Sequence, residues 1–462
     1  MKHLQVPVAV LLLCACSQSV FGQSGESWWS NWRGPNGTGA APAGNPPTEW
    51  GEEKNVRWKV AVPGLGSSSP IVWKDRVYVT TAIKTDKKGK TAAKPADSGE
   101  ERGGRRGGRR GGRRGRRGHG MNRTAPTMIH EFTVLCLDRL DGKIIWSTKV
   151  KDAVPHEGGH ATATQASNSP ITDGEFIYAS FGSRGVHCLD MQGNLKWSKE
   201  FGQMRTVMGF GEGASPVLHG DTLVVNWDHE GASFVVALDK RTGKELWRTP
   251  RDERTTWATP IVVKVGNRHQ VIITGSAASR GYDFKTGKVV WSCGGMTRNC
   301  IPSPIHRDGV VYLMSGFRGN SLQAIKLAGA KGDITDSKNV LWSLSRGTSY
   351  VPSALLEGDH LYFLRSNSSV LTCAHAKTGE IRFEGQRIEG MKTIYSSPVS
   401  ANGRVYLTSR KGVTKVIKAG AKYRELATNQ LEGDHFDSTI AIAGDELYLR
   451  SGKHLYCIAS KN

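Results

Sequence analysis

One short segment carries side chains that could hold a metal ion or move protons. The run HEGGH at 156–160 satisfies the pattern His-Glu-x-x-His, in which a helix aligns two histidines as zinc ligands and the glutamate as general base. A helix is disfavoured here because Pro155 precedes the run and two adjacent glycines lie inside it. We therefore reject a protease and expect hydrogen-bonding loop residues. A metal site of another geometry, using His156, Glu157 and His160, is the alternative.

Arginine recurs at equivalent places in short turns between apolar runs. Guanidinium groups bind carboxylates and phosphates through paired hydrogen bonds, so a ring of such turns would recognise an anionic ligand. The alternative is that these arginines are merely solvated turn residues. The six are Arg184, Arg280, Arg318, Arg365, Arg410 and Arg450.

The longer loops carry the remaining polar chemistry. Their carboxylates, guanidinium groups, amides and aromatic rings fit the mouth of a ligand-binding funnel. They do not form a recognisable catalytic constellation. Our binding candidates among them are Glu212, Arg254, Trp257 and Arg298. The same loops also contain Arg205, Asp252, Glu253, Asn299, Tyr350, Tyr395, His435 and Asp437.

The units that must position these residues repeat about every 45 positions, and a fixed period of this length indicates a repeat architecture. The segment ALDKRTGKELW at 237–247 recurs with variations along the chain. Within each unit, apolar runs of four to six residues rich in Val, Ile, Tyr and Trp are bounded by Gly-containing turns, which predicts strands. A Ser/Thr-Pro pair also recurs, beginning at Ser69, Ser169, Ser215, Thr259, Ser303 and Ser397.

Four strands fit into each unit, and such units arranged in a ring form a β-propeller. In the third unit we expect strands at Ser215–Leu218, Thr222–Asn226, Phe234–Asp239 and Lys244–Arg248. The eighth unit ends before a fourth strand, and a strand around Trp58 would complete it and leave no edge open. We therefore predict an all-β, eight-bladed propeller. Its units begin near residues 69, 169, 215, 259, 303, 352, 397 and 438.

Propeller topology then assigns the loops to faces. If the first strand of each blade starts at the top, the connections from fourth to first strand and from second to third strand both lie on the top face. The polar loops and the six arginine turns belong to these two classes of connection. We therefore expect a basic, polar funnel on one face of the ring.

Cysteine usage separates two kinds of position. Four cysteines occupy the same place in the third strand of different blades and are expected to be small buried residues held apart by the ring. These are Cys136, Cys188, Cys373 and Cys457. Cys293 and Cys300 flank one loop, and we expect an oxidising compartment to join them in a disulfide.

Half of the formal net charge of +22 lies in one insertion. Between Lys84 and Arg123 there are 15 Lys and Arg against 4 Asp and Glu, a net charge of +11, and the centre is almost only Arg and Gly. Such a composition cannot bury enough apolar surface to order itself. We expect a disordered insertion at 84–127 within the first blade. It is either a passive loop or a binder of anionic polymers or lipids whose contacts weaken with salt.

The repeated tail Ala-x-Asp-x-x-Thr-Gly-Lys-x-x-Trp, matched at every specified position by 237–247, resembles the tryptophan-docking motif of eight-bladed propellers of the pyrroloquinoline quinone (PQQ) type. The resemblance covers 55–462 apart from the insertion. It implies that each tryptophan stacks between neighbouring blades as part of the scaffold. These residues are Trp58, Trp146, Trp197, Trp247, Trp291 and Trp342.

Other segments of the sequence are similar to secreted PQQ-like propellers of bacterial envelopes. They are WRGPNG at 32–37, the HEGGH run, FGSRG at 181–185 and NWDHEG at 226–231. More distant relatives are the scaffold lipoprotein of the outer-membrane β-barrel assembly machine and the quinoprotein alcohol dehydrogenases. The dehydrogenases imply PQQ with calcium as cofactor. Their vicinal cysteine pair is absent here, and no calcium or PQQ ligands can be assigned.

The first residues indicate export. An apolar stretch at 6–16 follows Met1-Lys2-His3 and is too short to span a membrane, which is typical of a signal peptide. We expect a signal peptide at 1–22, an extension at 23–54 and the propeller at 55–462. The segment ending at Cys16 is close to a lipoprotein box, so a lipid anchor there is the alternative to a soluble form.

These observations favour a noncatalytic scaffold or ligand-binding propeller of the cell envelope, periplasmic or secreted. We expect a monomer that binds an envelope protein or an anionic partner on its top face. The alternatives are a PQQ-dependent quinoprotein dehydrogenase or another small-ligand enzyme. They stay open because the repeats predict the fold and not the activity. The sequence assigns no cofactor and no metal.

Overall fold

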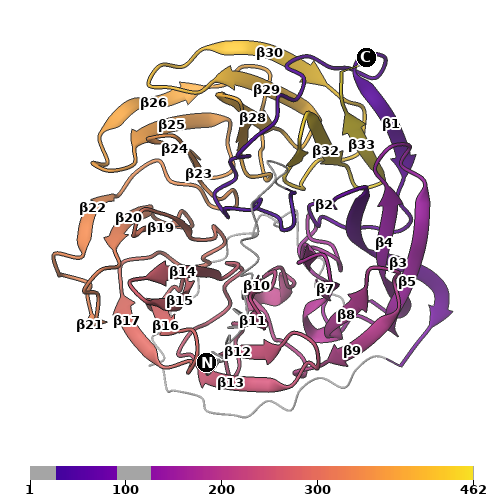
Figure 1. Cartoon of the computed structure of the whole chain (residues 1–462), viewed down its shortest axis with the longest axis horizontal. Coiled ribbons are helices and arrows are strands. Elements are labelled where there is room, and N and C mark those ends of the chain that lie inside the picture. Colours follow the sequence, from indigo (N-terminus) through magenta and orange to yellow (C-terminus); the bar gives the residue numbers. More distant parts are fainter. Residues whose placement is uncertain (1–27, 91–125, 461–462) are drawn as a thin grey trace, which may run out of the picture.

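The chain folds into a ring of eight small sheets around a central axis (Figure 1). This computed structural model describes residues 28–90 and 126–460. The predicted all-β, eight-bladed propeller of four-stranded blades is confirmed. The predicted signal peptide, Cys16 and the Arg/Gly tract lie outside the described residues. Within the described ranges, no helix is long and apolar enough to cross a membrane.

Each blade has its first strand near the axis and its fourth at the rim (Figure 1). Blade 1 contains β2 (Ile71–Trp73), β3 (Arg76–Lys88), β4 (Met128–Asp138) and β5 (Ile144–Ala153). Blade 2 contains β6 (Ile171–Thr172), β7 (Phe176–Ser180), β8 (Val186–Asp190) and β9 (Leu195–Lys199). Blade 3 contains β10 (Val217–His219), β11 (Thr222–Trp227), β12 (Phe234–Asp239) and β13 (Glu245–Pro250). Blade 4 contains β14 (Ile261–Val265), β15 (Arg268–Ile273), β16 (Ser279–Asp283) and β17 (Val289–Cys293).

The second half of the ring follows the same order. Blade 5 contains β18 (Ile305–Arg307), β19 (Val310–Ser315), β20 (Ser321–Lys326) and β22 (Val340–Leu344). Blade 6 contains β23 (Leu355–Glu357), β24 (His360–Leu364), β25 (Val370–His375) and β26 (Ile381–Arg387). Blade 7 contains β27 (Val399–Ala401), β28 (Arg404–Thr408), β29 (Val413–Lys418) and β30 (Glu425–Gln430). Blade 8 contains β31 (Ala441–Ala443), β32 (Glu446–Arg450), β33 (His454–Ile458) and β1 (Val56–Ala61). The short β21 (Gly332–Asp333) and two 3₁₀ turns, η1 (Gly182–Arg184) and η2 (Val207–Gly209), lie in connections.

Local sequence explains the strands of blade 3. The middle strand β12 is apolar and buried along almost its whole length because neighbouring blades cover both of its faces, whereas the rim strand β13 alternates between exposed and half-buried residues. The predicted bounds of β12 are reproduced. The first strand begins two residues later than predicted, at Val217, because the preceding Ser-Pro pair is used at the axis, where Pro216 has no N–H to offer a ladder.

The two ends of the chain close the ring together. Strand β1 pairs antiparallel with β33, with Trp58 opposite Cys457, as the missing fourth strand predicted. Glu446 of blade 8 reinforces the junction, because it accepts hydrogen bonds from Arg57 of β1 and, at 2.7 Å, from Arg139 of blade 1. The closure therefore joins both termini to the first blade.

Five of the six expected docking tryptophans share one geometry between blades. In each case the indole N–H donates to a backbone carbonyl of the next blade, at 2.9–3.2 Å. The indole ring covers the glycine of that blade's turn, where a Cβ atom would approach the ring to 2.4–2.8 Å. The pairs are Trp58 and Gly142, Trp146 and Gly193, Trp197 and Gly243, Trp247 and Gly287, and Trp342 and Gly379.

Trp291 is also buried between blades, in a cluster with Val311 and Ile325 of blade 5, but its docking geometry differs. Its indole N–H donates to Gln270 of its own blade at 2.9 Å, and the ring folds over Gly281, which lies opposite it on β16. Blade 5 has no docking glycine because the segment 327–339 replaces its turn. Within that segment β21 lies beside β17 and pairs with it in parallel (Figure 1). Trp291 is completely buried, in a cluster that includes Leu327 and Ile334 of the segment.

The cysteines are all buried and unpaired among the described residues. Cys136, Cys188 and Cys457 lie opposite Trp146, Trp197 and Trp58 in the strand register, where a small side chain leaves room for the indole. The expected disulfide between Cys293 and Cys300 is not formed. Their thiols face different neighbours, since Cys293 contacts Gln323 of blade 5 and Cys300 contacts Ser276 of blade 4.

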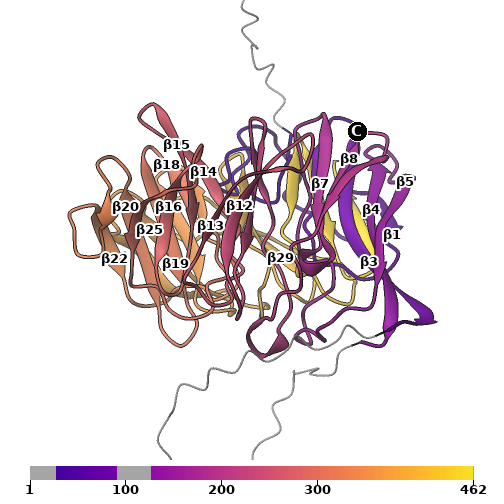
Figure 2. The ribbon, with the colours of Figure 1, turned by 90° about the horizontal axis from the view of Figure 1, so that it is seen from below.

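The hairpin that leads to the Arg/Gly tract is longer than expected. We predicted disorder from residue 84, but β3 continues to Lys88 and pairs with β4 as far as Met128. This hairpin extends beyond the ring (Figure 2). Residues 84–88 of the insertion are therefore strand.

The N-terminal segment 28–54 crosses the ring before it reaches β1 (Figure 1). Its backbone bonds to the first strands of distant blades, from Val72 N to Trp29 O at 2.8 Å and from Ala41 N to Ser400 O at 2.8 Å. The buried Arg33 donates to Pro398 O and to Ala354 O, in blades 7 and 6. What the sequence predicted only as an extension thus covers one end of the central channel.

Candidate functional site: a closed pocket on the propeller axis

A pocket of about 1100 Å³ lies on the axis of the ring. The loops that join the fourth strand of one blade to the first strand of the next surround its mouth. At the other end Trp32, next to the anchored Arg33, forms part of the lining. The N-terminal segment therefore contributes to the wall of the pocket through Trp32.

Eight hydroxyl groups encircle the inner part of this pocket. One Ser or Thr at the start of each blade accepts a hydrogen bond from the backbone N–H of its counterpart in the preceding blade, at 2.9–3.2 Å. All except Ser353 line the pocket. The ring consists of Ser69, Ser169, Ser215, Thr259, Ser303, Ser353, Ser397 and Thr439.

This hydroxyl ring explains the recurring Ser/Thr-Pro pairs, which the sequence analysis used only to mark repeats. In blade 8 the member is Thr439 rather than the expected Ser438, whose hydroxyl instead donates to Ser67 O at 3.1 Å. In the part of the chain that the structure describes, no ring hydroxyl donates its own hydrogen to a protein acceptor. These hydrogens are available to a molecule in the pocket.

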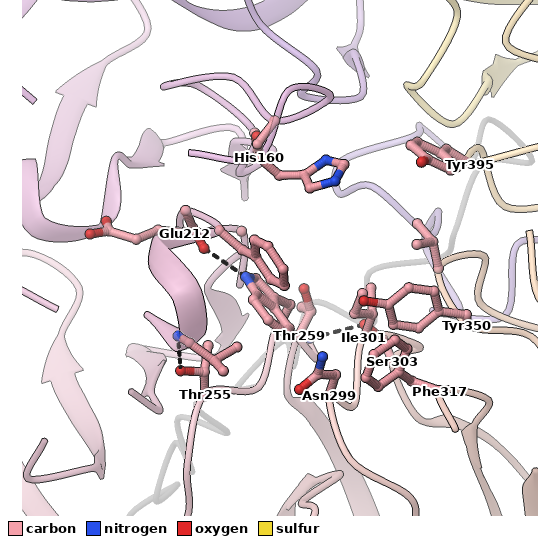
Figure 3. A pocket seen from close by; sticks show the side chains of 18 of the residues that line it. His160, Glu212, Thr255, Thr259, Asn299, Ile301, Ser303, Phe317, Tyr350 and Tyr395 are labelled. Carbon is pink, nitrogen blue, oxygen red and sulfur yellow. Dashed lines mark hydrogen bonds between the residues drawn. The ribbon is translucent and has the colours of Figure 1, made fainter. Parts of the chain in front are cut away.

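Half-buried aromatic side chains form much of the wall. Phe317 and Tyr350 stack on each other with ring centroids 4.8 Å apart, and Tyr395 lies farther around the mouth (Figure 3). Trp257 is fixed in orientation because its indole N–H donates to Gly211 O at 2.7 Å. Phe210 also lines the pocket and meets His160 edge to face at 5.4 Å.

Most carboxylates that line the pocket already accept hydrogen bonds from neighbouring groups. Glu253 accepts hydrogen bonds from Ala277 N, Ala278 N and Arg280, and Asp437 is bound by Arg410 at 2.6 Å. Glu230 accepts from the backbone and hydroxyl of Thr255. These groups hold loops in place and are poorly suited to accept a proton from a substrate.

Glu212 belongs to a buried cluster with His156. It accepts hydrogen bonds from the backbone N–H and the hydroxyl of Ser183, and burial raises its pKa. The imidazole of His156 lies 3.8 Å away and has a lowered pKa, chiefly because it is buried. His156 Nε2 donates to Met204 O at 2.6 Å, and its Nδ1 faces Arg184.

The HEGGH run does not converge on one point. Glu157 binds Thr206 through both carboxylate oxygens, and His160 Nδ1 contacts the Thr162 hydroxyl at 2.8 Å. Only His160 of the three lines the axial pocket. Across 28–90 and 126–460, no three His, Cys, Asp or Glu side chains are placed to share a metal ion. These side chains act as hydrogen-bonding loop residues.

The predicted ring of six arginines is not formed. Arg184 is buried beside His156, and burial lowers its pKa. Arg280 and Arg410 are paired with carboxylates, and Arg450 is only 1 % exposed, donating to Ser68 and Thr80 O. Arg365 is exposed but does not line the pocket.

Three arginines remain directed to solvent at the mouth. Arg254, Arg298 and Arg318 line the pocket, are exposed, and pair with no carboxylate of the described residues. Arg318 lies over the Phe317 ring, and the backbones of Arg298 and Phe317 form a β-bridge. The exposed Asp252 is the one lining carboxylate with no partner in the described parts of the chain.

Sequence reasoning thus found part of this site. His160, Glu212, Trp257, Arg254, Arg298 and Arg318 line the pocket as expected of a funnel, whereas Arg205 and His435 do not. It missed Trp32, Phe210, Phe317 and the hydroxyl ring. The repeated Ser/Thr was the signal that could have revealed the ring.

Comparison with known proteins decides the family. The profile of the family described as outer membrane protein assembly factor BamB matches residues 48–232 and 231–462. The chain belongs to this family. BamB of Francisella salina is 28% identical over 161 residues, which are 30% of this chain and 29% of that protein. The alignment thus spans less than a third of this relative's length.

Two solved structures share this fold. BamB of Moraxella catarrhalis superposes with a TM-score of 0.52 at 15% identity, covering 72% of this chain and 92% of that one. The computationally designed Ika8 protein gives a TM-score of 0.50 at 11% identity, with 74% and 98% covered. A europium-containing methanol dehydrogenase superposes over 94% of this chain and 98% of its own, at 11% identity and a TM-score of 0.46.

Proposed function

We propose that this protein is a noncatalytic binding propeller of the cell envelope, with the axial pocket as its binding site. The observation that carries the proposal is the state of the pocket wall. Its carboxylates, apart from Asp252, are engaged by neighbouring groups, while its arginines, aromatic rings and ring hydroxyls face the cavity. Such a wall offers recognition without a free general base beside a nucleophile.

Family membership supports the location and the kind of partner. The relatives are named as outer membrane protein assembly factors. We infer that this chain works in the periplasm or on the outer membrane as a monomer and engages an envelope component through the loop-bearing face. The pairing of β1 with β33 covers a strand edge of blade 8 that could otherwise pair with another chain.

PQQ with calcium is the competing occupant of the pocket. The three arginines would suit the carboxylates of PQQ. Calcium, however, needs several oxygen ligands, and the lining carboxylates other than Asp252 are bound to other groups. The experiment below therefore includes this cofactor.

The proposal is tested by photo-crosslinking in the native host. A benzoylphenylalanine at Tyr350 in the mouth should give specific adducts by mass spectrometry, whereas one at Leu341, exposed on the rim strand β22, should not. Purified protein mixed with PQQ and calcium should show neither a cofactor spectrum nor dye-linked alcohol oxidation. Adducts from Leu341 alone, or alcohol oxidation, would reject the proposed function.

A further inference from the structure

We propose that the axial pocket binds an acidic saccharide, a hydroxyl-rich ring that carries a carboxylate or a phosphate. This inference rests on the proposed function and names the ligand class of the same site. Three independent features of the wall converge on it: the hydroxyl ring, the aromatic surfaces and the unpaired arginines.

The hydroxyl ring presents hydrogen-bond donors from every side. Each ring oxygen already accepts a backbone N–H, as for Thr259 N to Ser303 Oγ at 2.9 Å, while its own hydrogen is left to donate. Donors that converge on one axis favour a ligand rich in oxygen acceptors. An apolar ligand would desolvate these hydroxyls without replacing their bonds to water, at a cost of roughly 1–3 kcal/mol for each.

The aromatic wall supplies flat surfaces of fixed orientation. Trp257 is held by Gly211, and Tyr350 is held by stacking on Phe317. Sugar rings expose faces of C–H groups with small positive partial charges, which match the negative face of an aromatic ring. A ligand that needs both many acceptors and flat C–H faces is a saccharide.

The arginines add the charge. Arg254, Arg298 and Arg318 come from three neighbouring connections between blades 3 and 5, so positive charge gathers on one side of the mouth. With Asp252 as the unpartnered lining carboxylate among the described residues, the free charge of the wall is positive. Guanidinium groups bind carboxylate or phosphate through paired hydrogen bonds.

The volume agrees with a ligand of more than one ring. At about 1100 Å³ the pocket reaches the upper end of the ~300–1,000 Å³ range of sites for drug-sized ligands. We therefore expect an oligosaccharide end inserted toward Trp32, with its acidic group at the arginine side of the mouth.

Calorimetric titration of the mature chain 23–462 tests this inference. The probes are trigalacturonic acid, glucose 6-phosphate, maltotriose and citrate, which separate carboxylate from phosphate and charge from sugar ring. At least one acidic sugar should bind about tenfold or more tightly than maltotriose and citrate. Its affinity should fall with ionic strength. Binding by neither acidic sugar, or citrate binding as tightly as both, overturns the proposal.

Matched variants locate the binding. Arg298→Gln and Arg318→Gln should each weaken the preferred acidic sugar about tenfold, since a hydrogen bond to a charged group contributes about 1.5–3 kcal/mol and 1.4 kcal/mol is tenfold. Arg365→Gln, an exposed arginine at the same end but outside the pocket, should change it less than twofold. Equal losses in all three variants would overturn the assignment. If Tyr350 still crosslinks in the host while no acidic sugar binds, the ligand class is wrong and the proposed function stands.

Discussion

Single buried side chains in this propeller are tied to neighbours far beyond their own strand. His187, only 1 % exposed in blade 2, is an example. Its Nε2 donates to Arg184 O at 3.0 Å and its Nδ1 accepts from the Ser198 hydroxyl at 2.8 Å, so both nitrogens are used by the neutral ring. Burial lowers its pKa to about 4. It thereby helps to fix η1.

We predict that the buried His187 makes the protein less stable in mild acid. The pKa of His187 in the unfolded chain is about 6.5. Between pH 6.5 and about 4, the unfolded chain therefore binds a proton at this imidazole and the folded chain does not. His187 should therefore cost up to about 3 kcal/mol of unfolding free energy as the pH falls through this window, and nothing above it. His187→Gln should flatten the dependence, measured by denaturant unfolding at pH 7.5, 6 and 5. A slope equal to the parent's would contradict this. Comparing each protein with its own value at pH 7.5 removes any uniform loss from the substitution.

At the level of elements, neighbouring blades are joined by an indole ring of one blade that packs on a turn glycine of the next. The turn glycine has a positive φ and also lies under the preceding blade's indole, as Gly287 does under Trp247. Blade 5 lacks that turn, and its neighbour's Trp291 is instead buried in a cluster with Leu327 and Ile334 of the segment that replaces it. Each junction therefore depends on the side chain and the receiving turn together.

Gly287→Ala should be much more destabilising than a matched alanine elsewhere. Its φ is +70°, and a Cβ would come within 2.4 Å of Trp247. Gly220 has a φ of +54° with no atom within 4 Å, so Gly220→Ala isolates the backbone penalty of about 1–2 kcal/mol. Overpacking should add about 1–3 kcal/mol at Gly287. Equal unfolding free energies for the two variants, by denaturant titration, would show that the indole contact is unimportant.

For the whole molecule, the segment before blade 1 has two separate tasks. Residues 28–54 close one end of the channel through Arg33 and its neighbours, whereas β1 completes blade 8 and is fixed to it by Arg57 and Glu446. The ring of hydroxyl bonds passes through all eight blades, so it depends on this closure.

Two truncations separate these tasks. A chain lacking 23–62 loses β1, exposes the edge of β33 and should aggregate or melt at a sharply lower temperature. A chain lacking only 23–50 keeps β1 and should remain a folded monomer with a smaller decrease. It loses the contacts of Arg33 and the buried Trp29 and Trp50, but every blade keeps its four strands. Thermal melting and light scattering provide the comparison. An unchanged melting curve for the longer truncation would disprove closure by β1.

The eight-bladed architecture could be predicted from the sequence because each strand depends on the apolar residues and turns of its own segment. The apolar run of β12, bounded by turns, is sufficient to place its ends, and the unit lacking a fourth strand indicated the role of Trp58. Small residues opposite the indoles, such as Cys136, also followed from strand position. The period of the repeats determined the number of blades.

Tertiary structure alone decided which polar groups are free to bind. Arg410 and Arg318 occupy similar turns, but Asp437 from the following connection neutralises the first and leaves the second at the mouth. The hydrogen bond from Arg33 to Pro398 O and the bond from Thr439 N to the Ser69 hydroxyl join residues more than 300 positions apart. Such contacts depend on how eight blades meet around one axis, and no local pattern encodes that meeting. The sequence therefore determined the ring, whereas its closure in space determined the pocket.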